Sequence, residues 1–222
     1  MQVKTINKVY ILGLGAMGAL YAAKLFDMNP DTIKIIMSHE RAKRSAGVVV
    51  NNKPYSFDFI FPEDNQPPAD LIIVAVKYLQ LDQAIQDIKP FVGKDTIVIS
   101  LLNGISSEQL IGKEIGIQHL LYAYGVGMDA VREGTMINYT NPGRIVFGEQ
   151  QNDVHSQRVI AVQDLFQRAL ITHQIPVDMQ KALWSKFMLN TGVNQVSALL
   201  KATYGVFQQN EEARKLMLMA AA

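Results

Sequence analysis

The chain has 222 residues, of which 49% are hydrophobic and 18% are charged, so it can bury a substantial core and is not disordered as a whole. Its 21 Lys and Arg nearly balance its 20 Asp and Glu, which argues against a nucleic-acid partner. It has no cysteine, which excludes disulfides, thiolate metal sites and thiol nucleophiles. It also lacks a signal-peptide stretch and an apolar run of membrane-helix length, which predicts a cytoplasmic protein without membrane contact.

Apolar, β-branched runs alternate with helical patterns through the first part of the chain. In chain order, the predicted strands are residues 8–12, 33–37, 48–50, 55–61, 71–76, 96–99, 119–125, 135–139 and 144–147. The predicted helices are residues 16–27, 79–88, 106–114 and 152–170. We expect a hairpin from strands 48–50 and 55–61, and a turn at residues 141–143 between the last two strands.

This alternation predicts an α/β fold, a Rossmann-like doubly wound and mostly parallel sheet, over residues 1–177. After a short extended link at 175–177, residues 178–222 have a helical pattern and are expected to begin an all-helical domain. Residues 211–222 are good helix formers without a stop signal. We therefore expect the chain to be cut inside that domain, with a fraying terminal helix as the alternative.

A glycine loop lies between the first predicted strand and the first predicted helix. We define it as residues 13–18, with the sequence Gly13-Leu14-Gly15-Ala16-Met17-Gly18 in the pattern G-x-G-x-x-G. In this context the glycines permit a tight turn, close approach of a pyrophosphate and close packing of helix on strand. The helix N-terminus then offers free N–H groups to the anion. The loop predicts a dinucleotide site, in preference to a purely structural glycine turn.

The end of the second strand indicates which dinucleotide binds. An NAD site usually has Asp or Glu about 20 residues after the glycine loop. This chain has Ser38 there, followed by Arg41, Lys43 and Arg44. A hydroxyl and a basic cluster suit the 2′-phosphate of NADP, so we predict NADP with Ser38 and Arg41 among its ligands. Two alternatives stay open: Glu40 could hold a ribose hydroxyl, and the cations could be ordinary surface residues.

Two further strand ends carry polar residues. Lys77 follows the strand predicted at 71–76, and Asn103 with Gly104 follows the strand predicted at 96–99 and its extension. Ligands of open α/β sheets bind beyond the carboxyl ends of the strands, so both side chains are candidates for cofactor or substrate contacts. The alternatives are a solvated Lys at a helix start and an Asn in an ordinary turn.

A polar stripe is expected on the helix that begins near residue 179. Lys186, Asn190 and Asn194 are spaced i, i+4, i+8 and share one helix face with mainly apolar neighbours. We call these three residues the Lys186 stripe. A Lys buried among apolar side chains could act as a proton donor, and the two Asn could orient substrate oxygens. An interhelical hydrogen-bond network is the alternative, and Lys181 lies on another face.

The four histidines, at positions 39, 119, 155 and 173, show no paired spacing. We interpret them as surface or ordinary core residues. No metal site is predicted.

Together these motifs resemble the ketopantoate reductase (2-dehydropantoate 2-reductase) family over the whole chain. They occur in family order as the glycine loop, Val76-Lys77, Asn103-Gly104, Leu183-Trp184-Ser185-Lys186, Asn190 and Asn194. The resemblance implies NADPH-dependent reduction of a small 2-oxo acid, 2-dehydropantoate, to pantoate on the route to pantothenate and coenzyme A.

By family likeness, Lys186 is the general acid, and Asn190 and Asn194 contact substrate. Lys77 and Asn103 line the boundary between cofactor and substrate, so Asn103 serves both, and Ala130 contacts the cofactor. The helical domain would bind substrate, and the resemblance leaves room for a homodimer through it. The family normally continues with further helices that supply a Ser and an acidic residue, and it often has Asn at the position of Tyr204.

Two other functions stay open. The chain could reduce another 2-oxo acid or act on a β-hydroxy acid, which only pocket shape and assay would distinguish. It could also be a non-catalytic NADP-binding sensor, although the intact Lys186 stripe argues against that.

Overall fold

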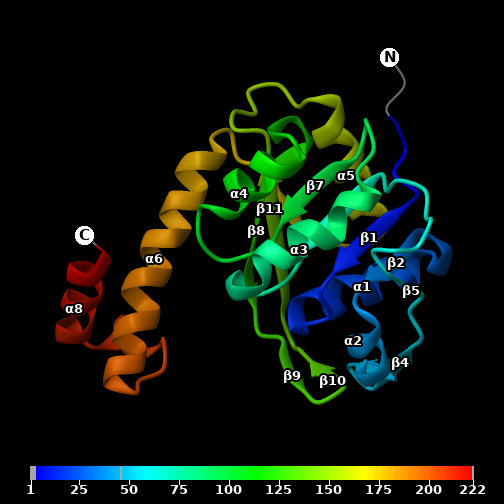
Figure 1. The fold of residues 1–222 in the computed structure, drawn as a ribbon. Coiled ribbons are helices and arrows are strands. Elements are labelled where there is room, and N and C mark those ends of the chain that lie inside the picture. The colour runs from blue at the N-terminus through cyan, green and yellow to red at the C-terminus, as the bar shows by residue number, and fades with distance from the viewer. Residues whose placement is uncertain (1–3, 46, 222) are drawn as a thin grey trace. The chain divides into compact units, whose positions relative to one another are not determined.

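The computed structural model describes residues 4–45 and 47–221, apart from the side chain of Arg44. The chain divides into two compact units, Met1–Met179 and Gln180–Ala222. All strands described belong to the first unit, and the second is helical (Figure 1). Among the described residues, no helix combines the length and the apolar character that crossing a membrane requires.

The first unit is built on an eight-stranded sheet with the order β12-β11-β8-β7-β6-β1-β2-β5. Its strands are β1 (Val9–Leu12), β2 (Ile33–Ile36), β5 (Phe59–Ile60), β6 (Leu71–Val74), β7 (Ile97–Ser100), β8 (Leu120–Met128), β11 (Pro142–Gly148) and β12 (His173–Gln174). Neighbouring strands are parallel except β8 and β11. In the centre, Val9 of β1 pairs with Ile33 and Leu71 on its two sides. The predicted mostly parallel sheet is confirmed.

Both faces of this sheet are buried, which explains why its strands are continuously apolar. Val9 and Ile11 of β1 belong to one core cluster, whereas Tyr10 and Leu12 belong to another. The first cluster includes apolar residues of α1 (Ala16–Met28) and α5 (Gln157–Arg168). The second includes those of α3 (Leu81–Ile88) and α4 (Ser107–Ile115). Helices therefore cover both faces, as a doubly wound fold requires.

A second, four-stranded sheet has the order β4-β3-β10-β9. It consists of β3 (Val48–Val50), β4 (Lys53–Tyr55), β9 (Val131–Glu133) and β10 (Met136–Asn138). Ile137 of β10 is fully buried in the same core cluster as α1. This small sheet thus joins two segments that lie far apart in the sequence and packs them against the first helix.

The small sheet corrects two predictions, one about a hairpin and one about a turn. The strand predicted at 55–61 is two strands: β4 ends at Tyr55 and forms the hairpin with β3, whereas β5 joins β2 in the main sheet. The hairpin turns at Asn51 and Asn52, whose φ values of 45° and 65° are ones that Asn tolerates. The turn predicted at 141–143 is wrong, because β10 lies in the small sheet and β11 begins at Pro142 and pairs with β8.

Other elements differ from prediction at their ends. The strand predicted at 71–76 ends at Val74, and the 3-10 turn η2 (Tyr78–Gln80) precedes α3. The helix predicted at 152–170 begins only at Gln157, because the Ser156 hydroxyl accepts a hydrogen bond from the Val159 N–H at 3.3 Å and caps it.

The second unit contains α6 (Met179–Leu200, which starts one residue before the unit), α7 (Val206–Gln209) and α8 (Glu211–Ala221). The predicted helical pattern is thus broken after Leu200, where Lys201 adopts a φ of 49°. A small cluster of Val196, Phe207 and Ala213 forms its buried core. At Gly192 an added Cβ would lie 2.6 Å from the Met217 carbonyl oxygen, so this glycine permits the close approach of α6 and α8.

Candidate functional site

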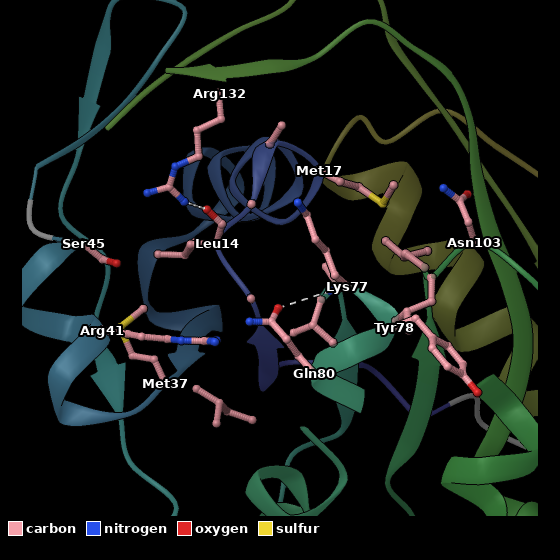
Figure 2. A pocket seen from close by; sticks show the side chains of 18 residues that line it. Leu14, Met17, Met37, Arg41, Ser45, Lys77, Tyr78, Gln80, Asn103 and Arg132 are labelled. Carbon is pink, nitrogen blue, oxygen red and sulfur yellow. Dashed lines mark hydrogen bonds between the residues drawn. The ribbon is translucent and has the colours of Figure 1, made fainter. Parts of the chain in front are cut away.

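A pocket of about 730 Å³ lies at the carboxyl ends of β1, β2, β6 and β7 (Figure 2). In the sheet, β1 lies between β2 and β6. From β1 the chain continues to β2 on one side, and the later strands β6, β7 and β8 follow on the other side, so the strand order reverses at β1. Ligands of open α/β sheets bind at such a reversal. The residues that line the pocket are Gly13, Leu14, Gly15, Ala16, Met17, Ile36, Met37, Arg41, Ser45, Ala75, Val76, Lys77, Tyr78, Gln80, Leu101, Leu102, Asn103 and Arg132.

The glycine loop forms the floor of this pocket, and its three glycines have different surroundings. Gly13 has a φ of 104°, and a Cβ there would lie 2.5 Å from the Ala75 carbonyl oxygen. A Cβ on Gly18 would collide with the carbonyl oxygen of Gly13. At Gly15, in contrast, an added Cβ would meet nothing within 4 Å. Gly13 and Gly18 are therefore required by the fold, whereas the protein itself sets no packing requirement for glycine at position 15.

The first turn of α1 faces the pocket without a side-chain cap. Gly15 is the N-cap residue, and neither a capping side chain nor an acidic residue stands in the first turn. The leading N–H groups of a helix lack intrahelical acceptors and carry a positive partial charge. Together with the space above Gly15, this helix end fits the phosphate groups of a dinucleotide.

The charge of the pocket has a single sign. Arg41, Lys77 and Arg132 line it, and none of the described residues lining it is Asp or Glu. Within residues 4–45 and 47–221, no carboxylate pairs with any of these three cations. Figure 2 shows Arg132 reaching the glycine loop at Leu14, while Arg41 and Lys77 come from other elements. Such a pocket favours a ligand with several negative charges.

The second strand leads to the residues predicted to bind the 2′-phosphate. Ser38 is exposed and is the N-cap residue of α2 (His39–Arg44). It lines a neighbouring pocket of about 180 Å³, which Arg41 also lines. Glu40, the alternative ribose ligand, lies in the first turn of α2 and lines neither pocket. The pocket at the end of β2 thus carries a hydroxyl and a guanidinium, and Asp87 of α3 also lines it.

Lys77 and Asn103 reach the same pocket from neighbouring strands. Lys77 is exposed, and its backbone N–H donates to the Gln80 side-chain oxygen at 3.4 Å. Asn103 follows β7, ahead of Gly104 with a φ of 109°. Below this turn the Ser100 hydroxyl donates to the Ser107 hydroxyl, at 2.8 Å. The sheet edge thus brings together the glycine loop, Lys77 and Asn103, as predicted.

The segment that contains Ala130 and Arg132 differs from the prediction at both residues. Ala130, predicted to contact the cofactor, packs against the main core and is not among the residues lining the pocket, so its role stays a prediction. Arg132, two positions later, lines the pocket and was not predicted. The available signal was its cationic side chain in a segment already singled out, but only the pairing of the small sheet places it at the glycine loop.

The Lys186 stripe lies on one unbroken helix, α6, of the second unit. Lys186 and Asn190 are half-buried, whereas Asn194 is exposed. The Tyr204 hydroxyl donates to the Asn194 Oδ1 atom at 2.5 Å. The shared face is what the spacing predicts, and Tyr204 holds the last carboxamide of the stripe. That the stripe faces Lys77 and Asn103 stays a prediction.

Three of the four histidines have ordinary partners in the structure. His39 pairs with Glu63 at 2.5 Å on the surface, and the Nδ1 atoms of His119 and His173 lie 2.9 Å from the carbonyl oxygens of Thr96 and Ile171. Among the described residues, no group of three His, Cys, Asp or Glu is arranged to hold a metal ion.

The fold, with a glycine loop at the reversal of its strand order, is that of a Rossmann-type oxidoreductase domain. The chain belongs to the ketopantoate reductase family. Residues 9–152 match the family described as Ketopantoate reductase PanE/ApbA, and residues 178–222 match Ketopantoate reductase PanE/ApbA C terminal.

Individual proteins agree with this membership. The 2-dehydropantoate 2-reductase of Streptococcus pyogenes serotype M6 is 29% identical over 215 residues, covering 94% of this chain and 69% of that protein. The ketopantoate reductase from Staphylococcus aureus, described as dimeric, has a TM-score of 0.75 at 23% identity, covering 95% of this chain and 76% of that one. D-mandelate dehydrogenase, in a structure with NADH and anilino(oxo)acetate, has a TM-score of 0.80 at 20% identity, covering 95% and 70%. Both structural similarities show the fold alone.

Proposed function

We propose that the chain acts as a 2-dehydropantoate 2-reductase, which reduces 2-dehydropantoate to pantoate with NADPH. One observation carries the proposal: the pocket at the strand reversal combines an uncapped helix N-terminus and open space above Gly15 with a lining whose described residues include three cations and no carboxylate. Family membership adds the substrate, a small 2-oxo acid.

Gly15 offers the sharpest test of dinucleotide binding. Its backbone is extended, with a φ of −65°, so Ala fits there without strain, and only the open space would be lost. Gly15→Ala should weaken NADPH binding at least about tenfold, a loss of roughly 1.4 kcal/mol, and leave the thermal midpoint unchanged. Gly205→Ala is the matched control, because Gly205 also has open space and a φ of −58°. Unchanged NADPH affinity in Gly15→Ala would contradict the proposal.

NADPH is the proposed cofactor in preference to NADH. Ser38 takes the place of the usual acidic ribose ligand, and the Arg41 guanidinium beside it has no carboxylate partner among the described residues. Arg41→Ala should therefore weaken NADPH binding and leave NADH binding nearly unchanged. Titration of nucleotide fluorescence measures both. Tighter binding of NADH than of NADPH by the unaltered protein would contradict this choice.

The proposed chemistry divides the site residues by role. NADPH, when bound, supplies the hydride that reduces the ketone carbon. Lys186 donates a proton to the oxygen of that ketone, and its charge stabilises the negative charge that develops there. Asn190 and Asn194 orient the substrate, while Lys77 and Asn103 hold the boundary between substrate and cofactor.

Reduction of another 2-oxo acid is the second candidate. It is favoured by Tyr204, which stands at a position where the family often has Asn. The Tyr204 hydroxyl donates to Asn194 Oδ1, so the hydrogen-bonding groups left for the substrate differ from those in such family members. Assaying NADPH oxidation with a panel of 2-oxo acids decides between the two. A non-catalytic sensor would bind NADPH and oxidise it with none of them.

We also propose that the helical unit mediates a homodimer. Several large apolar side chains of α6 and α8 are exposed, including Trp184, Leu189 and Met219 at 51%, 56% and 76%. The related S. aureus enzyme is described as dimeric. Light scattering measures the mass directly, and a monomer at all concentrations would contradict this proposal. The cytoplasmic location remains a prediction.

A further inference from the structure

Arg132 joins the small sheet to the glycine loop. It lies on β9, and its Nη1 donates to the Leu14 carbonyl oxygen while its Nε donates to the Gly134 carbonyl oxygen at 2.8 Å. These two bonds hold the guanidinium beside the glycine loop, where it lines the pocket (Figure 2). The side chain is half-buried, so its position is fixed by packing as well as by hydrogen bonds.

Most of the hydrogen-bonding capacity of Arg132 is still open. A guanidinium has five N–H donors, and the two bonds to carbonyl oxygens use two of them. Within the part of the chain that the structure describes, no carboxylate neutralises this charge. The remaining donors belong to a side chain that lines the pocket, and the other described cations lining it are Arg41 and Lys77. A guanidinium so placed suits a phosphate, which it can bind through two parallel hydrogen bonds.

We propose that Arg132 is a ligand of the pyrophosphate of the bound dinucleotide and closes the small sheet over the glycine loop. The inference rests on the proposed function, since it requires a dinucleotide at this loop. Its contact with Leu14 places Arg132 at the part of the loop that a pyrophosphate approaches. Arg41 belongs instead to α2, after β2, where the ribose 2′ position is expected. The two arginines thus serve different phosphates.

Three ligands separate this role from the alternatives. NADPH and NADH both contain the pyrophosphate, whereas adenosine 2′-monophosphate contains the 2′-phosphate and no other phosphate. Arg132→Ala should weaken NADPH and NADH equally, by about 10- to 100-fold, and leave adenosine 2′-monophosphate unchanged. Arg132→Lys, which keeps the charge but loses the planar fork, should lose less. Arg144→Ala is the matched control, because Arg144 is exposed on β11 and does not line the pocket.

Each other outcome overturns the proposal. Loss of NADPH affinity alone would assign Arg132 to the 2′-phosphate. Equal loss for all three ligands together with a lower thermal midpoint would make it a structural support of the loop. Unchanged affinities would remove it from the site. If Arg132→Ala does not fold, the same three affinities are measured in Arg132→Lys, and the relative losses among the ligands test the proposal. If the unaltered protein binds neither NADPH nor NADH, the proposed function itself fails. That outcome is distinguishable from failure of the Arg132 proposal, which concerns only the variants.

Discussion

The two units bury their apolar residues to different extents. The first has two extensive clusters, one on each face of the main sheet, and the described residues that line the 730 Å³ pocket belong to it. The second has a core of Val196, Phe207 and Ala213, and large apolar side chains of its helices remain exposed. Because apolar side chains stabilise a fold only when they leave water, the second unit has much less of its own to hold it together. The proposed cofactor ligands and the proposed proton donor therefore lie in units whose buried clusters differ in size.

The chain carries a separate probe for each unit. Its single tryptophan, Trp184, lies on α6, so tryptophan fluorescence reports on the helical unit. All described strands lie in the first unit, so the β signal of circular dichroism reports on the sheet. If the units differ as their cores indicate, Trp184 fluorescence should change at lower urea concentration than the β signal. Coincident transitions would show that the units unfold together.

The largest expected effect separates chemistry from binding. Lys186→Ala should lower kcat by about 10²–10⁴, or roughly 3–5 kcal/mol of barrier, because the alkoxide oxygen loses its proton donor. NADPH affinity should change little, because the glycine loop is in the other unit. Steady-state assay with 2-dehydropantoate measures the first and fluorescence titration the second. Lys181→Ala is the control, since Lys181 is exposed on another face of α6, and an equal loss in that variant would show that the helix register is wrong.

The next effect concerns the stability of the sheet unit. Gly18→Ala should destabilise it by about 1–3 kcal/mol, because the new Cβ would collide with the Gly13 carbonyl oxygen and force α1 away from the loop. Urea unfolding followed by circular dichroism checks this. Gly15→Ala should leave the urea midpoint unchanged. An equal shift in both variants would contradict the inference that Gly18 is needed for packing and Gly15 for approach of the ligand.

A smaller effect depends on pH. The Asp70 carboxylate accepts hydrogen bonds from the N–H groups of Asn7 and Lys8, both at 3.0 Å, and pairs with Lys4 at 3.0 Å. Burial alone would raise the pKa of this carboxyl, but the hydrogen bonds and Lys4 outweigh it and hold the pKa below its ordinary value. Its stabilisation is therefore present at neutral pH and lost as the pH falls through that lowered pKa.

The test compares two pH values. Between pH 7 and pH 3 the unaltered chain should lose up to about 1 kcal/mol more sheet stability than Asp70→Asn does, because only the unaltered chain has this carboxylate to protonate. Trp184 fluorescence should report no such difference between the two proteins. Identical acid sensitivity of their sheet transitions would rule out Asp70 as the cause.

The smallest expected effect lies in the helical unit. Tyr204→Phe removes the hydroxyl that holds the Asn194 carboxamide, a bond worth about 0.5–1.5 kcal/mol. The KM for the 2-oxo acid should rise about 2- to 10-fold, while the dissociation constant of NADPH stays constant. A changed NADPH affinity with constant KM would mean that Tyr204 serves the cofactor.

Local patterns in the sequence were sufficient for the features that depend on neighbours along the chain. The glycine loop, the apolar strands and the spacing of Lys186, Asn190 and Asn194 are all of this kind. The small sheet was not predictable in the same way, because Val49 pairs with Met136 and no periodicity links segments so far apart. The position of Arg132 depends on that pairing, so no local pattern pointed to the arginine, and Ala130 in the same segment was named from the family resemblance alone. Whether Lys186 faces the pocket depends on tertiary packing, which spacing alone does not encode.

The contact of Arg132 with Leu14 spans 118 positions of the chain, and this separation bears on the order of assembly. During synthesis the glycine loop is made before β9 and β10, and Arg132 can contact Leu14 only once these strands have been made and β10 has paired with β3. NADPH would then bind only the finished sheet unit, so it should slow unfolding without accelerating refolding, and faster refolding in its presence would contradict this. The cofactor would thus stabilise the sheet unit only after it has folded. A shortage of NADPH in the cell would then shorten the lifetime of the folded protein without impairing its initial folding.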